Sequence, residues 1–282
     1  MNALPSLFIS HGAPTLPLES GPVVQFFKTL GSLLPTPRAI LVISAHWETP
    51  EPTVSAAPQP ATLHDFYGFP PPLYRLHYPA PGDPALANRV QAMLTAAGIP
   101  TQIDPNRGLD HGAWNPLLLI YPEARIPVVQ LSIQPQKDPA YHYHLGQALQ
   151  PLRAEGVLIL ASGGATHNLR ELIAPAWRRP LPTAGWSETQ AEFTDKPPAW
   201  VAHFDQWLSQ TISSGQVQEL LNYRTLAPEA VRNHPRDEHL LPLFVAAGAG
   251  GPANTWAQLF QGYTYGVLSM AAFRFGSLEP ES

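Results

Sequence analysis

The chain has 282 residues, of which 44% are hydrophobic and only 13% are charged, with a formal net charge of −5. A chain of this length can bury a large hydrophobic core. Lys and Arg form no cluster with aromatic residues, which argues against a nucleic acid partner. No apolar run approaches the roughly 18 residues of a membrane-spanning helix, and the N-terminus lacks a signal-peptide pattern. We therefore expect a cytoplasmic protein with no nucleic acid or membrane partner.

The absence of cysteine excludes disulfide bonds, thiolate nucleophiles and cysteine-ligated zinc. Proline is in excess, because 34 residues are more than twice the typical share of about 5%. These prolines are scattered between apolar runs, so they indicate long, ordered loops and not low complexity. The longest of these loops, residues 48–82, also holds several aromatic residues. A loop of this length inside a compact domain is usually functional.

Three hydrophobic runs follow the same pattern. Each is typical of a buried strand, ends near a serine, and is soon followed by a histidine. The carboxyl ends of parallel strands form the edge where open α/β sheets bind ligands. We therefore expect the three histidines to meet there in a metal-centred site. The runs are residues 5–10 before His11, 39–45 before His46, and 156–162 before His167.

Helical patterns alternate with the strand-like runs through most of the chain, which favours an α/β fold with a largely parallel central sheet flanked by helices. One helix has clear boundary signals: Asp83 as N-cap, Pro84 in the first turn, and Gly98 at the end. No repeat or linker is visible, so we expect one domain over residues 1–282. The other expected helices cover residues 22–33, 115–121, 138–152, 166–173, 237–247 and two segments within 187–213; further strands are expected at 101–103, 126–133 and 265–273.

Without cysteine, a metal site must use histidines and carboxylates. His46 follows five buried apolar residues, and a buried imidazole needs a partner for each nitrogen. For His11 a polar loop role is about equally plausible. His239 could also have a purely structural role, as a first-turn residue that caps a helix or faces solvent. Its neighbour Glu238 is an alternative ligand.

The remaining histidines carry weaker signals. His64 and His111 lie in aromatic, glycine-containing loops that suit a pocket for a flat ligand. We expect three histidines on probable helices to face solvent, and two in loops carry no signal. The first three are His142, His144 and His203; the other two are His77 and His234.

Six short motifs, each weak alone, occur in one order from residue 6 to about residue 270. They are SHGAP at 10–14, SAHW at 44–47, HDF at 64–66, DHG at 110–112, GGATHNL at 163–169 and EHLLPL at 238–243. Together they resemble the class III extradiol ring-cleavage dioxygenases of the LigB superfamily, in particular the DOPA-dioxygenase-type branch. The resemblance implies a single-domain α/β fold with one mononuclear metal and an enzyme that opens a catechol ring with O2.

The same resemblance implies roles for individual residues. His167 would be the acid–base residue beside the metal, or a fourth ligand in a resting zinc form, and His111 would help to hold substrate or oxygen. The implied metal ligands are His11, His46 and His239, and the residues expected to bind the flat substrate are His64, Trp47 and Tyr67, with Phe66 and Trp114 beside them.

One departure affects the expected metal. The ring-cleaving LigB prototypes have a carboxylate as third ligand, whereas the matching position here is His239, as in the DOPA-type branch. Three neutral imidazoles suit zinc, so we expect Zn(II) in the isolated protein and Fe(II) for turnover. The expected partners are a small aromatic diol and O2, with a possible homo-oligomer. Two alternatives remain: a zinc hydrolase, although no glutamate is an obvious general base, and a non-enzymatic Memo-type metal-binding protein.

Overall fold

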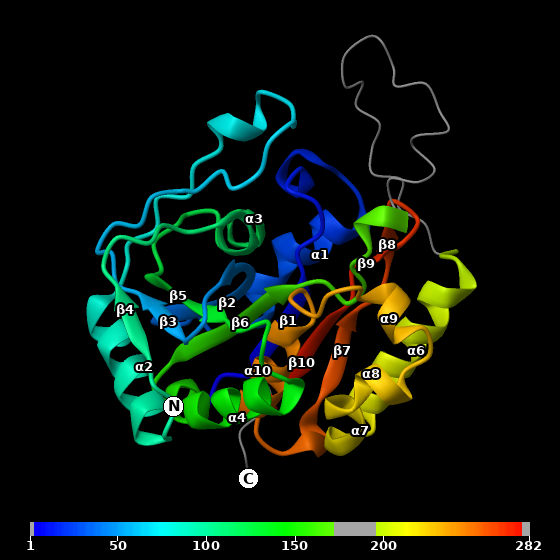
Figure 1. Cartoon of the computed structure of the whole chain (residues 1–282). Coiled ribbons are helices and arrows are strands. Elements are labelled where there is room, and N and C mark those ends of the chain that lie inside the picture. The colour runs from blue at the N-terminus through cyan, green and yellow to red at the C-terminus, as the bar shows by residue number, and fades with distance from the viewer. Residues whose placement is uncertain (1–2, 172–195, 278–282) are drawn as a thin grey trace.

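The computed structural model describes residues 3–171 and 196–277. Its centre is an eight-stranded sheet in the order β4-β3-β5-β2-β6-β1-β10-β7 (Figure 1). The four inner strands β5, β2, β6 and β1 run parallel, whereas β10 and β7 add antiparallel strands at one edge. The predicted α/β fold with a mostly parallel sheet is confirmed, and the extent of one catalytic domain over residues 1–282 stays a prediction.

The strands of the large sheet are β1 (Ser6–Ser10), β2 (Ala39–Glu48), β3 (Thr53–Ser55), β4 (Gln102–Asp104), β5 (Val128–Ile133), β6 (Val157–Gly163), β7 (Ala257–Phe260) and β10 (Ala272–Phe275), and β8 (Tyr263–Thr264) pairs with β9 (Leu268–Ser269). The described helices are α1 (Pro22–Leu30), α2 (Pro84–Ala96), α3 (His111–Ile120), α4 (Pro139–Leu149), α6 (Ala199–Ser213), α7 (Val217–Leu221), α8 (Tyr223–Leu226), α9 (Ala230–Asn233) and α10 (Leu241–Ala249). None of them is both long and apolar enough to cross a membrane.

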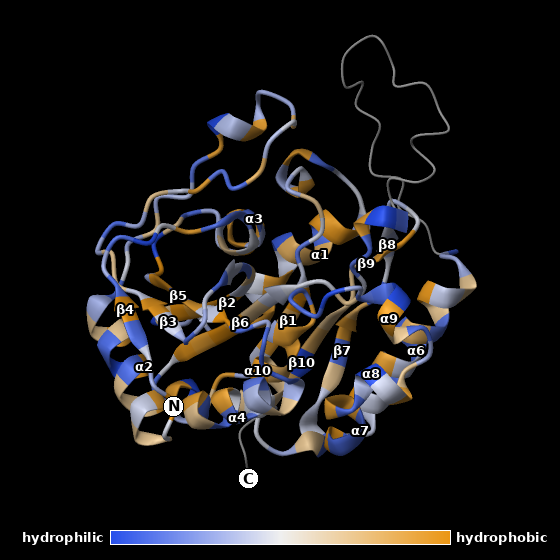
Figure 2. Cartoon of the chain, viewed as in Figure 1, coloured by the Kyte–Doolittle hydropathy of each residue, from blue (hydrophilic) through white to orange (hydrophobic). Residues whose placement is uncertain are grey.

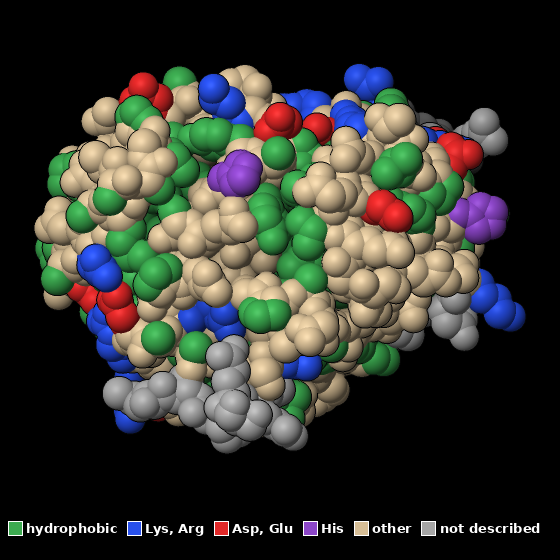
Figure 3. All heavy atoms as spheres, turned by 90° about the horizontal axis from the view of Figure 1, so that it is seen from below, with side chains coloured by type: hydrophobic (Ala, Val, Ile, Leu, Met, Phe, Trp, Pro, Cys, Tyr) green, Lys and Arg blue, Asp and Glu red, His purple; other side chains and the backbone are tan. Residues whose placement is uncertain are grey.

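Helices cover both faces of the sheet, because side chains of a strand alternate between its faces. Leu41 and Ile43 of β2 join the core built with α2, α4, α6 and α10, whereas Ile40 and Val42 join the core built with α1 and α3. Figures 1 and 2 show these two layers, with the hydrophobic strands between them. On the face drawn in Figure 3, Lys and Arg are interspersed with Asp and Glu and form no continuous basic patch among the described residues.

Local capping chemistry explains the helix starts that the sequence predicted. Asp83 accepts a hydrogen bond from the Leu86 amide (2.9 Å), and Pro84 is the first residue of α2. Asp138 caps α4 in the same way through the Tyr141 amide (2.8 Å). An aspartate at the N-cap satisfies an amide that would otherwise have no partner in the helix.

Several predicted boundaries were wrong. Helix α3 begins at His111 and not at residue 115, because Asp110 caps it by accepting from the Ala113 amide. The helix expected over residues 237–247 begins at Leu241, so His239 lies in the turn before it. The final strand expected at 265–273 is divided between β9 and β10. Of the helix expected at 166–173, residues 169–171 are helical and residues 172–173 lie outside the described residues, as does the first helix expected within 187–213.

The expected exposure of His142 was wrong, whereas His144 and His203 are exposed as predicted. His142 is fully buried because it shares one face of α4 with Leu145 and Leu149, three and seven residues further on. Its Nδ1–H donates to the Asp138 carbonyl (2.9 Å), and its Nε2 accepts from the Gln134 amide (3.3 Å). Both ring nitrogens therefore have partners only when the imidazole is neutral.

Burial lowers the pKa of His142 to about 4, so acid should destabilise the protein through this residue. Between pH 6.5 and 4 the unfolded chain binds a proton at His142 and the folded chain does not, so stability falls as pH falls. When the pH falls from 7 to 5, the free energy of unfolding should drop in both proteins. We expect the drop to be about 1–2 kcal/mol smaller in His142→Gln than in the unmodified protein. Urea unfolding at both pH values measures this, and an equal loss in both proteins would contradict it.

Candidate metal centre

Three histidines converge at the carboxyl edge of the parallel strands. His11 follows the last residue of β1, and His46 lies near the end of β2. Strand β6 separates β1 from β2, and its register pairs Ser10 with Gly163 and Ser44 with Ser162. The strand ends are therefore level, which brings the two histidines side by side with their rings 4.9 Å apart.

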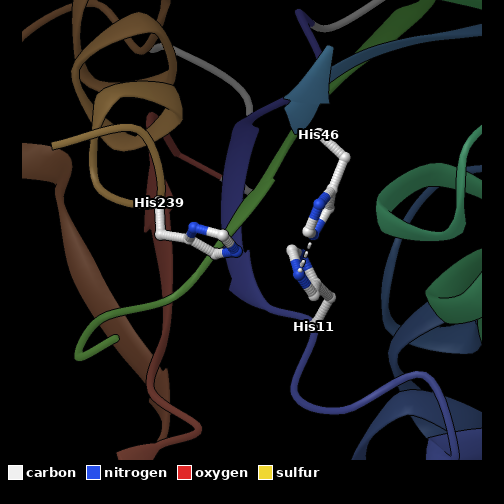
Figure 4. A group of neighbouring side chains, drawn as sticks. All are labelled: His11, His46 and His239. Carbon is white, nitrogen blue, oxygen red and sulfur yellow. Dashed lines mark hydrogen bonds between the residues drawn. The ribbon is translucent and has the colours of Figure 1, made fainter. Parts of the chain in front are cut away.

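The third histidine, His239, reaches the cluster through a close backbone contact with the end of β6. The Gly164 amide donates to the His239 carbonyl (2.9 Å). A Cβ atom at Gly163 would lie 2.0 Å from that carbonyl oxygen, so only glycine permits the approach. The ring of His239 then lies 5.5 Å from that of His11 and 4.9 Å from that of His46. Figure 4 shows the three side chains turned toward one another.

The three imidazoles fit a single divalent metal ion. The Nε2 atoms of His11 and His46 are 3.0 Å apart, and the ligand atoms of all three residues lie within 4.8 Å of one another. Two nitrogens bound to a tetrahedral zinc ion at about 2.0–2.1 Å would lie about 3.4 Å apart. Three protein ligands also leave positions for other molecules on the same ion.

Partners of the Nδ1 atoms orient two of these rings. Ser162 donates its hydroxyl to the Gly112 carbonyl, so it must accept from His11 Nδ1–H at 2.9 Å. His239 Nδ1–H donates to the Glu238 carboxylate (3.1 Å). In both histidines the proton is held on Nδ1, which leaves the Nε2 lone pair for a metal.

Burial keeps the cluster in the form that binds metal. Burial, together with the neighbouring imidazoles, lowers the pKa of His11, His46 and His239 well below the usual value. A histidine can ligate a metal ion only when it is neutral. These three residues are therefore neutral, and able to bind a metal, throughout the physiological pH range.

His167 lies against the cluster, stacked on His239 with ring centroids 3.3 Å apart. Burial lowers its pKa to about 3, and the nearest Glu238 oxygen is 3.9 Å from its Nδ1. Hydrogen bonds from outside hold its loop: the His167 amide donates to the Asn233 carbonyl (3.0 Å), and His234 Nε2–H donates to the Ala165 carbonyl (2.9 Å). His234, which carried no signal in the sequence, is fully buried.

His111 is the first residue of α3, and its ring lies 3.9 Å from that of His46. This approach depends on Gly112, because a Cβ atom there would lie 2.3 Å from Ser44 Oγ. Asp65 accepts from both the amide and the Nδ1–H of His111. Burial alone would raise the pKa of Asp65, but these bonds and the nearby His46 lower it to about 2. Asp65 had no role predicted from the sequence.

The residues expected to bind substrate differ in their burial and in their contacts near the histidine cluster. His64 is half-buried, donates to the Leu76 carbonyl (3.1 Å) and lies 5.7 Å from the Trp114 ring. Trp47 neighbours His46 in β2, and the Arg107 guanidinium covers its ring at 5.0 Å. Tyr67 is 92% exposed. Phe66 is nearer to the cluster, with its ring 5.6 Å from that of His111.

A family model described as the catalytic LigB subunit of aromatic ring-opening dioxygenase matches residues 5–274. The chain belongs to the LigB family. It is 42% identical to the 4,5-DOPA dioxygenase extradiol of Beta vulgaris over 98% of both chains. It is 38% identical to the protein of that name from Escherichia coli (strain K12), covering 97% of this chain and 95% of that one.

A solved structure supports the same relationship. The crystal structure of an uncharacterised protein from Escherichia coli K12 has a TM-score of 0.76 and 34% sequence identity, and covers 97% of this chain and 100% of that one. The predicted resemblance, the fold class and an enzyme of the extradiol ring-cleavage type are thus confirmed. The roles of individual residues within this LigB family member remain predictions.

Proposed function

We propose that this LigB family member opens the ring of a DOPA-like catechol with O2, at one Fe(II) ion held by His11, His46 and His239. The convergence of the three imidazoles carries the proposal. Bound Fe(II) would supply open coordination positions and the one-electron chemistry that O2 requires. The names of the relatives from Beta vulgaris and Escherichia coli favour DOPA as the catechol to test first.

In this proposal His167 moves the proton. Its neutral imidazole accepts the proton of a catechol hydroxyl and later returns it to the opening ring. Glu238, whose carboxylate is 3.9 Å from His167 Nδ1, stabilises the imidazolium while the proton is held. The catechol bond next to the two hydroxyls breaks, and both oxygen atoms of O2 enter the product.

Aromatic side chains near the cluster support a flat substrate. The rings of Phe66 and Trp114 lie 6.3 Å apart, and that of His111 lies 5.6 Å from Phe66. His111 would hold the substrate or O2 through its ring. His64 contacts the same aromatic group and would contribute to its shape. Tyr67, which is exposed, would take part only indirectly, whereas Trp47, next to His46 in β2, would line the same site.

Oxygen uptake by metal-exchanged protein tests the function. Protein stripped of metal and reloaded anaerobically with Fe(II) should consume one O2 per DOPA or catechol and form a yellow, ring-opened product. The Zn(II)-loaded protein is the matched control: it should bind metal equally well, since three imidazoles suit zinc, but consume no O2. Ester or amide hydrolysis by the zinc form would instead indicate a hydrolase. Metal retention without any turnover would indicate a Memo-type binding protein.

A further inference from the structure

One carboxylate joins the loop after β3 to the start of α3. Asp65 Oδ1 accepts from the His111 amide (2.9 Å) and from His111 Nδ1–H (3.0 Å). A backbone hydrogen bond fixes this placement, because the Leu63 amide donates to the Leu109 carbonyl (2.8 Å). Leu63 lies two residues before Asp65, and Leu109 lies two residues before His111. The Asp65 side chain is 27% exposed and that of His111 is 7% exposed. The His111 side of the contact is therefore shielded from water, and the ionised carboxylate makes the hydrogen bond charge-assisted and strong.

The double contact determines where the His111 proton lies. A carboxylate only accepts hydrogen bonds, so a neutral His111 must keep its proton on Nδ1. Its Nε2 then carries the free lone pair. The ring lies 3.9 Å from that of His46 and 5.6 Å from that of His11. We propose that Asp65 is a positioning residue, which sets the tautomer and ring orientation of His111 so that Nε2 serves the ring-opening reaction. This inference rests on the proposed function.

The geometry separates this role from simple helix capping. The His111 amide is one of the amides at the start of α3 that have no partner within the helix, and Asp65 satisfies it. Asp110 already caps α3 through the Ala113 amide, so helix formation does not depend on Asp65 alone. The bond to Nδ1 satisfies no amide of the helix; it acts on the orientation of the His111 ring.

Nitrogen NMR of the histidine rings tests the tautomer without any turnover. In Zn(II)-loaded protein, which is diamagnetic, long-range ¹H–¹⁵N spectra should show His111 protonated on Nδ1, with His111→Ala used to assign its signals. Asp65→Ala should shift His111 toward a mixture of both tautomers. Asp65→Asn should keep the Nδ1–H form, because the amide oxygen can still accept both bonds. A proton on Nε2 in the unmodified protein, or no change in Asp65→Ala, would overturn the proposal.

Steady-state kinetics of the Fe(II) protein with DOPA test the consequence. Loss of an orienting partner of this kind typically costs about 10–100-fold in activity, so Asp65→Ala should lower kcat by that factor. Asp65→Asn should recover most of it, and Glu123→Gln, a remote and exposed carboxylate change, should have no effect. Combining Asp65→Ala with His111→Ala should add no further loss beyond His111→Ala. Independent losses in the double variant would show that Asp65 does not act through His111.

The two measurements separate failure of this inference from failure of the proposed function. If the iron-loaded protein opens no catechol, the proposed function fails, and the NMR experiment still decides the tautomer. If turnover is normal and the Asp65 variants leave both the tautomer and kcat unchanged, only the role of Asp65 fails.

Discussion

Replacing His167 with alanine should lower kcat for ring opening by about 10²–10⁴-fold, the usual contribution of general acid–base catalysis, while metal stays bound. The imidazole is neutral and lies against the metal cluster, stacked on His239. Alanine removes the proton acceptor but leaves the Nε2 atoms of the three proposed ligands in place. Oxygen uptake with DOPA, together with metal content by elemental analysis, measures both effects.

The control for this experiment is His144→Ala, because His144 is exposed on α4 and its side chain bonds to Gln147, which is exposed as well. It should retain full activity and full metal content. Unchanged turnover in His167→Ala would remove the acid–base role. Loss of metal from His167→Ala would instead make His167 a fourth ligand. This outcome is open because His167, Glu238 and His239 also form a group that could hold a metal ion.

Replacing His46 with alanine should abolish both metal binding and ring opening. The Nε2 atoms of His11 and His46 lie 3.0 Å apart, so His46→Ala removes one of the two ligands that are paired most directly by the strands β1 and β2. Zinc present at 1,000 times its Kd should stabilise the unmodified protein by about 4 kcal/mol. The His46→Ala variant should gain no stability from zinc. Thermal unfolding of both proteins with and without zinc measures this difference. His77→Ala, on an exposed loop, should respond to zinc like the unmodified protein.

A pair of substitutions, Glu238→Gln and His239→Ala, separates the two candidates for the third ligand. If His239 binds the metal, Glu238→Gln should retain it, because the amide oxygen still accepts from His239 Nδ1–H. If Glu238 is the ligand, Glu238→Gln should lose metal and His239→Ala should retain it. Zinc stoichiometry after dialysis decides between these outcomes. Full retention of zinc in both variants would show that neither Glu238 nor His239 is an essential ligand.

Much of the secondary structure was predictable because its causes are local. Continuous runs of apolar residues predicted β1, β2, β5 and β6, since strands buried on both faces show no polar alternation. An aspartate followed by a proline predicted the starts of α2 and α4, where the side chain and the next few amides make the cap themselves. Family motifs selected three of the 11 histidines as expected ligands, and this assignment stays a prediction.

Predictions were wrong where a residue's surroundings come from distant parts of the chain. His142 was expected to face solvent, yet α10 packs on α4 and His142 is fully buried. His234 gave no signal, yet it supports the His167 loop from a segment more than 60 residues away. Trp47 was expected beside the substrate, and this role stays a prediction.

By itself, the sequence determined the α/β pattern, the absence of cysteine chemistry, and the residue types from which a metal site could be built, because these depend on local propensity and composition. Only the tertiary structure decided which histidines meet. That outcome depends on the strand order β2-β6-β1, whose level ends bring His11 and His46 together, and on Gly163, whose missing side chain admits His239. It also decided that Asp65 bonds to His111, 46 residues further along the chain. Contacts between such distant residues arise from packing, and no local pattern encodes them.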